Sequence, residues 1–274
     1  MEKCIVLFSG GLDSRLAVKI MQERGYEVIS LHFNLPFGCG CSNINELQMK
    51  GVNLVVLNAT KGELFKEYMN VIKNAKYGRG AGYNPCKDCK IFMFKKAKEY
   101  ADSKGIKIIA TGEVLGQRPM SQTKNAMEII DNEIGFKLTR PLTEIGISGR
   151  RRDKQIALAK KYKIEYPSPA GGCLLCEKGL KSRFELLIKN NLIKEETLHL
   201  IRVGRHFINS KRWIVLGRNS KENEIIEKQP GIKILPEQPG PSAWINDIKL
   251  VNKAEKLIKK YSKHEIIDFE IKLK

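Results

Sequence analysis

The sequence predicts an α/β protein with a doubly wound parallel sheet, followed by a second, smaller α+β domain. Short apolar runs alternate with amphipathic helical patterns in the first third of the chain, and a Gly-Ser-rich turn follows the first apolar run. Buried parallel strands read as nearly continuous apolar runs joined by helices. A segment rich in Pro and Gly at 166–172 then interrupts this rhythm. We therefore expect a first domain at 1–178 and a C-terminal domain at 179–274.

The elements follow from local patterns along the chain. We expect parallel strands at residues 3–8, 27–33, 53–57 and 106–110, with a fifth at 136–139. We expect helices at residues 14–24, 86–103 and 150–163. In the C-terminal part, helical patterns cover about 180–203, and residues 212–218 read as a strand.

Charge and hydropathy limit the class of protein. The 274 residues carry a net charge of +19, of which +7 falls on residues 1–150 and +12 on residues 151–274. This excess favours a polyanionic partner such as RNA, and a solvated lysine-rich surface is the alternative. No apolar run reaches the ~18 residues of a membrane span, and the first run is too short for a signal-peptide core. We expect a cytoplasmic protein with no membrane partner.

The turn after the first predicted strand has the composition of a phosphate-binding loop. Its sequence is Ser9-Gly10-Gly11-Leu12-Asp13-Ser14. Gly10 and Gly11 let the backbone approach phosphate oxygens, and the free amides at the start of the next helix favour negative charge. Ser9 and Ser14 offer hydroxyl donors, and Asp13 could reach a magnesium ion on the phosphates. No Gly-x-x-x-x-Gly-Lys-Ser/Thr motif occurs, so the kinase-like loop is excluded.

This hexapeptide resembles the SGGxDS loop of the ATP-pyrophosphatase (PP-loop) superfamily. The resemblance implies ATP and magnesium as cofactors, adenylation of a carbonyl-type oxygen and release of pyrophosphate. Three later segments, at 111–117 (TGEVLGQ), 121–123 (SQT) and 140–142 (RPL), look like elements of the tRNA 4-thiouridine synthase branch. The branch resemblance implies tRNA as the partner, with Gly112 and Glu113 near the nucleotide at the carboxyl edge of the sheet.

The seven cysteines suggest sulfur or metal chemistry. They comprise the single Cys4 and the pairs Cys39/Cys41, Cys86/Cys89 and Cys173/Cys176. In a reducing compartment, close pairs favour metal, cluster or sulfur chemistry over structural disulfides. Cys86 and Cys89 begin a predicted helix, whose dipole stabilises a thiolate. Their Pro-Cys-x-x-Cys motif resembles that of 2-thiouridine-synthase-like thiolation enzymes, in which a later cysteine completes the site.

This second resemblance leaves the sulfur carrier open. Either the cysteines carry a persulfide, or three of them hold an iron-sulfur cluster with one iron free for sulfide. We expect a cluster ligated by Cys86, Cys89 and either Cys173 or Cys176. A four-cysteine zinc site and free redox thiols are the alternatives. The tighter Cys39/Cys41 spacing is a poorer ligand pattern, equally compatible with a buried structural role.

RNA binding is expected in the C-terminal domain. The 4-thiouridine branch typically carries an RNA-binding region before its PP-loop, whereas here the loop starts at residue 9. Residues 203–207 and 213–219 look like the small RNA-binding-type domain at the end of ribosome-quality-control proteins. The candidate RNA contacts are Arg202, Arg205, Lys211, Arg212 and Arg218, with Phe207 and Trp213 as stacking or core residues.

Together these patterns predict an ATP-dependent tRNA sulfurtransferase. It would adenylate a nucleobase carbonyl oxygen and replace that oxygen with sulfur at the cysteine site. One alternative is a PP-loop enzyme that adenylates a small molecule for amidation or sulfur mobilisation. Another is a non-catalytic RNA-binding protein with a structural zinc site, which the intact phosphate loop disfavours. The modified nucleotide, the sulfur donor and the oligomeric state are left open.

Overall fold

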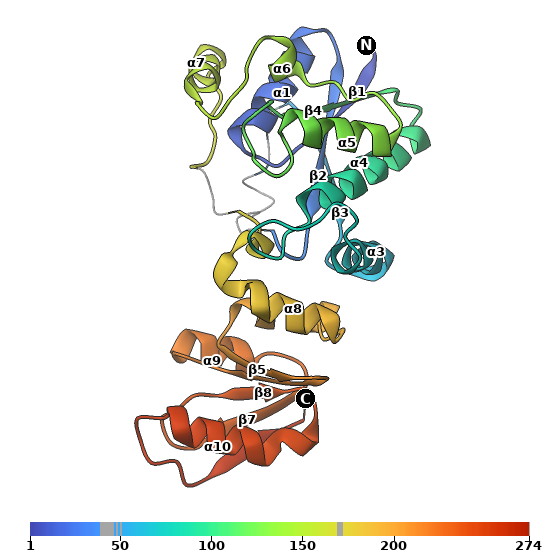
Figure 1. The fold of residues 1–274 in the computed structure, drawn as a ribbon. Coiled ribbons are helices and arrows are strands. Elements are labelled where there is room, and N and C mark those ends of the chain that lie inside the picture. Colours follow the sequence, from blue (N-terminus) through green and yellow to red (C-terminus); the bar gives the residue numbers. More distant parts are fainter. Residues whose placement is uncertain (39–46, 48, 50, 169–171, 274) are drawn as a thin grey trace. The chain divides into compact units, whose positions relative to one another are not determined.

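The computed structural model describes residues 1–38, 47, 49, 51–168 and 172–273, and Cys39 and Cys41 therefore lie outside the described residues. The chain forms two compact units, Met1–Lys178 and Gly179–Lys274, which are described separately below (Figure 1). Among the described residues, no helix is long and apolar enough to span a membrane.

The first unit is built on a four-stranded parallel sheet of order β3-β2-β1-β4. Its strands are β1 (Lys3–Leu7), β2 (Glu27–Asn34), β3 (Asn53–Asn58) and β4 (Ile108–Thr111). Leu7, the last residue of β1, pairs with Leu31 on one side and Thr111 on the other. The chain thus steps outward from β1 to β3 and then crosses to β4 beyond β1. Open α/β sheets bind ligands at such a switch point.

Helices cover both faces of this sheet, as a doubly wound fold requires. They are α1 (Leu12–Glu23), α3 (Gly62–Lys73), α4 (Cys86–Ser103), α5 (Lys124–Ile134), α6 (Pro141–Glu144) and α7 (Asp153–Tyr162). The α1 helix packs on one face through residues such as Val18 and Met21. The α4 and α5 helices pack on the other through residues such as Phe94 and Ile130. The predicted doubly wound α/β fold is confirmed.

The predicted fifth strand at 136–139 is wrong. Its pairing with the sheet is confined to one isolated bridge between Thr139 and Ala110. Gly135, in the left-handed region at φ 71°, ends α5 immediately before this segment. Pro141 begins α6 two residues after Thr139. The segment is therefore too short to extend the ladder.

The second unit contains a five-stranded antiparallel sheet of order β5-β6-β8-β7-β9. Its strands are β5 (Arg205–Asn209), β6 (Arg212–Leu216), β7 (Ile232–Pro236), β8 (Ala243–Ile245) and β9 (Phe269–Lys272). The helices from the end of the first unit onward are η1 (Leu174–Cys176), η2 (Lys178–Leu180), α8 (Lys181–Lys189), η3 (Glu195–Arg202), α9 (Ser220–Glu227), η4 (Ile248–Leu250) and α10 (Val251–Tyr261). The α10 helix packs on one face of the sheet with Ile214 and Ile245. The expected smaller α+β region is thus present.

Trp213 belongs to the core of the second unit. Its side chain is 0% exposed, and its ring meets that of Trp244 edge-on at 5.2 Å between centroids. The indole Nε1 donates to Nδ1 of His206 at 3.2 Å. Of the two roles considered for Trp213, the structure therefore shows packing and excludes stacking on a nucleobase.

His206 is held neutral by its surroundings. Its Nε2 donates to the carbonyl of Val203 at 2.8 Å, because Nδ1 is the acceptor for Trp213. Burial, reinforced by the charge of Arg183, lowers the pKa of His206 from 6.5 to about 3. A proton on Nδ1 would abolish the bond from Trp213 and place a charge in the core.

We predict that acid destabilises the second unit through His206. The folded pKa of about 3 lies below the ordinary value of 6.5. The stabilisation that comes from keeping His206 neutral is therefore fully present above pH 6.5 and is lost as the pH falls. By pH 5 the free energy of unfolding should be lower by ~2 kcal/mol. Because Trp213 and Trp244 are the two tryptophans of the chain, urea unfolding followed by tryptophan fluorescence reports this unit alone. His206→Asn should remove this part of the pH dependence, and the exposed control His264→Asn should keep it. Equal pH dependence in all three proteins would refute the assignment.

Candidate active site

The phosphate loop connects β1 to α1 and brings its predicted residues together in one turn. Ser9 Oγ donates to Ser14 Oγ at 3.3 Å, and Ser14 Oγ in turn donates to the carbonyl of Gly11 at 2.9 Å. Gly10 has a φ of 79°, and a Cβ there would lie 2.4 Å from the side chain of Leu47. A residue other than glycine would therefore distort the loop. The turn leaves the first amides of α1 without helical partners, as an anion site requires.

Arg15 supports this loop from inside the protein, and the sequence analysis did not find it. The side chain is buried, and its Nε donates to the carbonyl of Gly10 at 2.7 Å. Burial lowers the pKa of Arg15. In sequence it resembles any polar residue of an amphipathic helix, so only the tertiary structure identifies its role.

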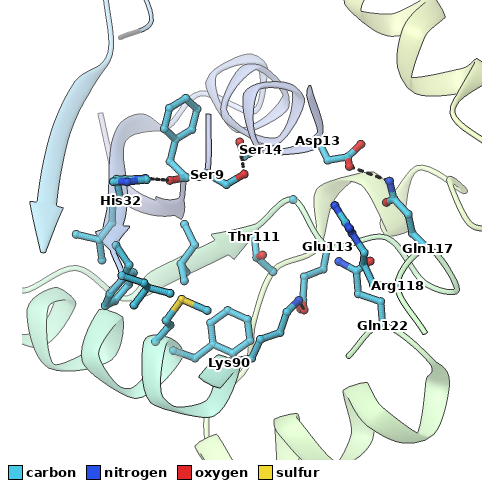
Figure 2. Close-up of a pocket in the computed structure, with 18 residues that line it drawn as sticks. Ser9, Asp13, Ser14, His32, Lys90, Thr111, Glu113, Gln117, Arg118 and Gln122 are labelled. Carbon is cyan, nitrogen blue, oxygen red and sulfur yellow. Dashed lines mark hydrogen bonds and ion pairs between the residues drawn. The ribbon is translucent and has the colours of Figure 1, made fainter. Parts of the chain in front are cut away.

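A pocket of ≈ 360 Å³ lies beside the loop at the carboxyl edge of the sheet (Figure 2). Its polar lining comprises Ser9, Asp13, Ser14, His32, Lys90, Thr111, Glu113, Gln117, Arg118 and Gln122. Within the described part of the chain, four buried acceptor atoms of this lining have no protein partner. They are Asp13 Oδ1, His32 Nε2, Gln117 Oε1 and Gln122 Oε1. Buried acceptors that line one cavity call for a ligand that brings donors or a cation.

Asp13 is arranged to hold a cation. Its Oδ2 accepts from Gln117 Nε2 at 2.9 Å, which fixes the carboxylate and leaves Oδ1 for a ligand (Figure 2). A carboxylate oxygen next to a phosphate loop is the ligand type that magnesium prefers. Asp13 and the loop donors therefore fit a magnesium nucleotide in chemistry and in position.

His32 presents an acceptor in the same pocket. Its Nδ1 lies 2.8 Å from the carbonyl of Phe8 and, facing an acceptor, must carry the ring proton. Burial lowers the pKa of His32, so the ring stays neutral and Nε2 keeps its lone pair.

Gly112 lies directly against the phosphate loop. A Cβ at this position would stand 2.6 Å from the carbonyl oxygen of Asp13 and 2.8 Å from the amide nitrogen of Ser14. Both of these neighbours are backbone atoms, so they cannot move aside as a flexible side chain could. The end of β4 packs so closely against the loop that position 112 has no room for a side chain, which explains why it is a glycine.

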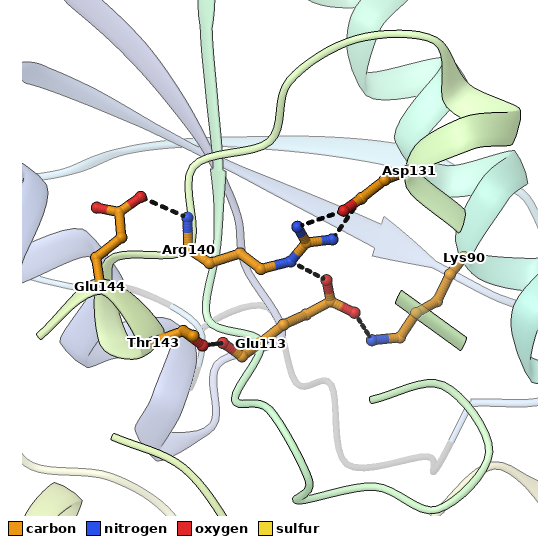
Figure 3. A network of polar contacts seen from close by, with 6 residues as sticks. All are labelled: Lys90, Glu113, Asp131, Arg140, Thr143 and Glu144. Atoms are coloured by element: carbon orange, nitrogen blue, oxygen red, sulfur yellow. Dashed lines mark hydrogen bonds and ion pairs between the residues drawn. The ribbon is translucent and has the colours of Figure 1, made fainter. Parts of the chain in front are cut away.

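Glu113 is the centre of a buried ionic network (Figure 3). The side chain is 3% exposed, forms an ion pair with Lys90 and accepts from Arg140 Nε at 3.1 Å. Arg140 also donates to both oxygens of Asp131, at 2.9 and 2.6 Å. Both carboxylate oxygens of Glu113 are thus occupied by cations. Glu113 therefore positions Lys90 at the pocket, a residue that the sequence analysis did not single out.

The first cysteine pair lies at the start of α4, as predicted. Asn84 Nδ2 donates to Cys86 Sγ at 3.1 Å. Cys89 Sγ lies 3.5 Å from the hydroxyl of the fully buried Tyr68. Both sulfurs thus have a polar neighbour on the first unit's own helices and loops.

Two backbone hydrogen bonds bring the second pair to the first. The amide of Leu174 donates to the carbonyl of Phe37 at 2.9 Å, and the amide of Tyr83 donates to the carbonyl of Leu175 at 2.7 Å. A Cβ on Gly82 would stand 2.3 Å from that same carbonyl oxygen, so glycine is required there. The turn that carries Cys173 and Cys176 is therefore fixed on the loop that precedes α4.

The four cysteines differ in the direction in which their surroundings shift the pKa of the thiol. The hydrogen bond from Cys173, with further help from Cys86 and the charge of Arg118, lowers the pKa of Cys176 to about 6. Burial raises the pKa of Cys89 to about 12 and also raises that of Cys86. The pKa of Cys173 is raised because it donates to Cys176. Cys176 therefore ionises most readily of the four cysteines.

Four cysteine sulfurs are the donor type that iron-sulfur clusters and zinc use. Across residues 1–38, 47, 49, 51–168 and 172–273, however, no three His, Cys, Asp or Glu side chains are disposed to hold a metal ion. The four cysteines thus fit a cluster or zinc in chemistry, whereas their arrangement is that of hydrogen-bonded thiols.

The cysteine set and the nucleotide pocket share two cations. Lys90 lines the pocket, and its charge lowers the pKa of Cys86. Arg118 lines the pocket as well, and its charge lowers the pKa of Cys176. Lys90 also directly follows Cys89 in α4, so the first cysteine pair borders the pocket.

Comparisons with known proteins identify the family. The profile of the family described as thiamine biosynthesis protein (ThiI) matches residues 1–181. The tRNA-specific 2-thiouridylase MnmA of a Nitratiruptor species is 32% identical over 118 residues, which cover 40% of this chain and 34% of that protein. A "probable tRNA sulfurtransferase" of Thermococcus kodakarensis is 30% identical over 171 residues, which cover 58% of this chain and 40% of the relative.

A third relative, a "probable tRNA sulfurtransferase" of Saccharolobus islandicus (strain M.16.27), is 28% identical and covers 72% of this chain and 50% of its own length. The chain thus spans about a third to a half of the length of these relatives. Among solved structures, that of a "predicted subunit of tRNA methyltransferase from Methanocaldococcus jannaschii DSM" covers 67% of this chain and 88% of its own, with 18% identity and a TM-score of 0.41. Because the family profile matches well over half of the sequence, the chain belongs to the ThiI family, in the tRNA-thiolation branch of the PP-loop ATPases.

Proposed function

We propose that the protein is an ATP-dependent tRNA sulfurtransferase that forms AMP and pyrophosphate. The observation that carries the proposal is the position of Lys90, which lines the pocket beside the phosphate loop and directly follows Cys89 in α4. An enzyme that activates a base and then transfers sulfur to it needs both sites within reach of one substrate atom. The names of the relatives support tRNA as that substrate.

The first step is adenylation of the nucleobase. The carbonyl oxygen of the base attacks the α-phosphorus of ATP, and the bond to the β-phosphate oxygen breaks. The hydroxyls of Ser9 and Ser14 and the first amides of α1 stabilise the departing pyrophosphate. Asp13 would hold magnesium, which supplies charge neutralisation on the phosphates when bound. Lys90, fixed by Glu113, adds a positive charge on the far side of the pocket.

The second step replaces oxygen with sulfur. Sulfur attacks the ring carbon that bears the adenylated oxygen, the carbon–oxygen bond breaks, and AMP leaves with the oxygen. Cys176 is the residue best suited to take the terminal sulfur of a donor persulfide, whose own thiolate then leaves. Once that sulfur is bonded to the base, a second cysteine of the set attacks Cys176 Sγ. This frees the thiolated base and leaves a cysteine disulfide, which an external thiol reduces. If a cluster is present, Cys86, Cys89 and either Cys173 or Cys176 would hold it, and an open iron would supply a sulfide site. A zinc ion ligated by all four cysteines would leave no such position.

Asp13→Asn should abolish activation of the base. The amide keeps the contact with Gln117 but loses the charge that binds magnesium. We expect tRNA-dependent pyrophosphate release to fall at least ~100-fold, which corresponds to ~2.7 kcal/mol of transition-state stabilisation. Asp153→Asn is the matched control, because Asp153 is an exposed acidic residue in the first turn of α7. Parental release by Asp13→Asn would show that the nucleotide site is misassigned.

Cys176→Ser should separate sulfur transfer from activation. We expect thiolated tRNA to fall at least ~100-fold while pyrophosphate release falls less than ~10-fold, because the serine hydroxyl is neither ionised nor a sulfur carrier. Cys4→Ala is the control, since Cys4 is a buried thiol of β1 whose pKa is raised to about 12 by burial. An equal loss of both reactions in Cys176→Ser would instead indicate a structural role.

Metal content tests the identity of the sulfur carrier. If the cysteines hold a cluster, anaerobically purified protein should contain iron and acid-labile sulfide, with visible absorbance that fades in air. Cys86→Ser should lose this absorbance. Stoichiometric zinc without iron, together with retained thiolation in Cys86→Ser, would reject the cluster.

A further inference from the structure

The α10 helix has two faces of opposite character. Ala254 and Ile258 are 0% exposed and pack on the sheet of the second unit. The exposed side carries the lysine row, which we define as Lys253, Lys256, Lys259, Lys260 and Lys263. The first four lie within the helix, and Lys263 follows its end. Spacings of three, four and seven residues place the four helical lysines along one face.

The lysine row has no internal counterions. The one acidic residue of the helix is Glu255, and no ion pair within the described ranges involves a member of the row. Some other helical lysines form such pairs, for example Lys98 with Asp102 and Lys66 with Glu63. Like charges three and four residues apart destabilise a helix. A row without counterions is therefore explained better by an external polyanion than by packing alone.

An exposed aromatic ring lies at the end of the row. Tyr261, the last residue of α10, is 39% exposed. The guanidinium of Arg205, from β5, lies 4.8 Å from its ring centroid, and Lys260 Nζ lies 5.9 Å from it. Phe207 supports the ring from the core side at 6.0 Å between centroids. An exposed ring bordered by cations is suited to contact both a base and its phosphate.

The chemistry of the face favours a nucleic acid over a lipid surface. A helix that binds a membrane inserts its apolar side between the headgroups. The apolar side of α10 is already used, because Ala254 and Ile258 are buried against the sheet. Within the helix the row extends over ~10 Å from Lys253 to Lys260 at the helical rise, enough to contact more than one phosphate.

We propose that the lysine row of α10, together with Arg205 and Tyr261, is the surface that binds the phosphate backbone of the tRNA substrate. The inference rests on the proposed function, since it takes tRNA as the substrate. The proposed surface shares Arg205 with the RNA contacts expected from the sequence but replaces most of the others with lysines of α10. Arg218, for example, forms an ion pair with Glu222.

The test compares two charge-matched triple variants of the full chain. Lys253→Gln/Lys256→Gln/Lys260→Gln removes three charges from the row and keeps helix propensity nearly constant. The control replaces three exposed lysines of α8, α9 and the residue after α9, namely Lys189, Lys221 and Lys228, by Gln. Binding of unmodified tRNA is measured by fluorescence anisotropy over a range of salt concentrations, and melting temperatures verify that each variant is folded.

We expect the row variant to bind tRNA at least ~10-fold more weakly, with a salt slope shallower by about two to three. The control should bind within ~3-fold of the parent. Tyr261→Ala should weaken binding without changing the slope, because no charge is removed.

Three outcomes would show that the lysine row is not the surface that binds tRNA. One is parental affinity and slope in the row variant, and another is an equal loss in the control. The third is loss of binding to phosphatidylserine vesicles, rather than to tRNA, in the row variant. Each of these leaves the proposed function standing if the parent still binds and thiolates tRNA. A parent protein that binds no tRNA at any salt concentration would instead refute the proposed function.

Discussion

The close contact between Gly112 and the Asp13–Ser14 peptide determines the geometry of the first unit. The end of β4 can approach the phosphate loop so closely because position 112 lacks a Cβ. The next residue, Glu113, is thereby held beside the pocket, where it binds Lys90 and Arg140. Lys90 in turn belongs to α4, the helix that begins with the cysteines. One backbone contact thus relates the phosphate loop to the sulfur site.

Charge balance explains why cations stand between the two sites. In the proposed reaction ATP would bring several negative charges to the pocket, and Cys176 is the most readily ionised of the four cysteines because the hydrogen bond from Cys173 lowers its pKa. Two such groups at short range repel each other strongly in a partly buried site. Lys90 and Arg118 both line the pocket. The charge of Lys90 also lowers the pKa of Cys86, and that of Arg118 lowers the pKa of Cys176. In the proposed reaction, these cations would let an anionic sulfur stay close to the adenylated base.

Local patterns in the sequence predicted the sheet, the phosphate loop and the start of α4 at Cys86, because each depends on neighbouring residues. They failed where the function of a residue depends on distant ones. Arg15 and Lys90 look like ordinary helical polar residues, and their partners Gly10 and Glu113 are revealed by the folded chain. The false strand at 136–139 failed for a related reason. Its apolar residues fit a strand, but the helix cap and the proline around it leave no length for pairing.

Cys86, Cys89 and Lys90 lie on one helix, so α4 sets the distance between the cysteine set and the pocket. Rigid helical geometry fixes the separation and the relative direction of these side chains. One inserted residue between Cys89 and Lys90 would rotate the cysteines by ~100° about the axis and shift them by ~1.5 Å relative to the pocket. The number of residues along this stretch is therefore as strict a requirement as their identity.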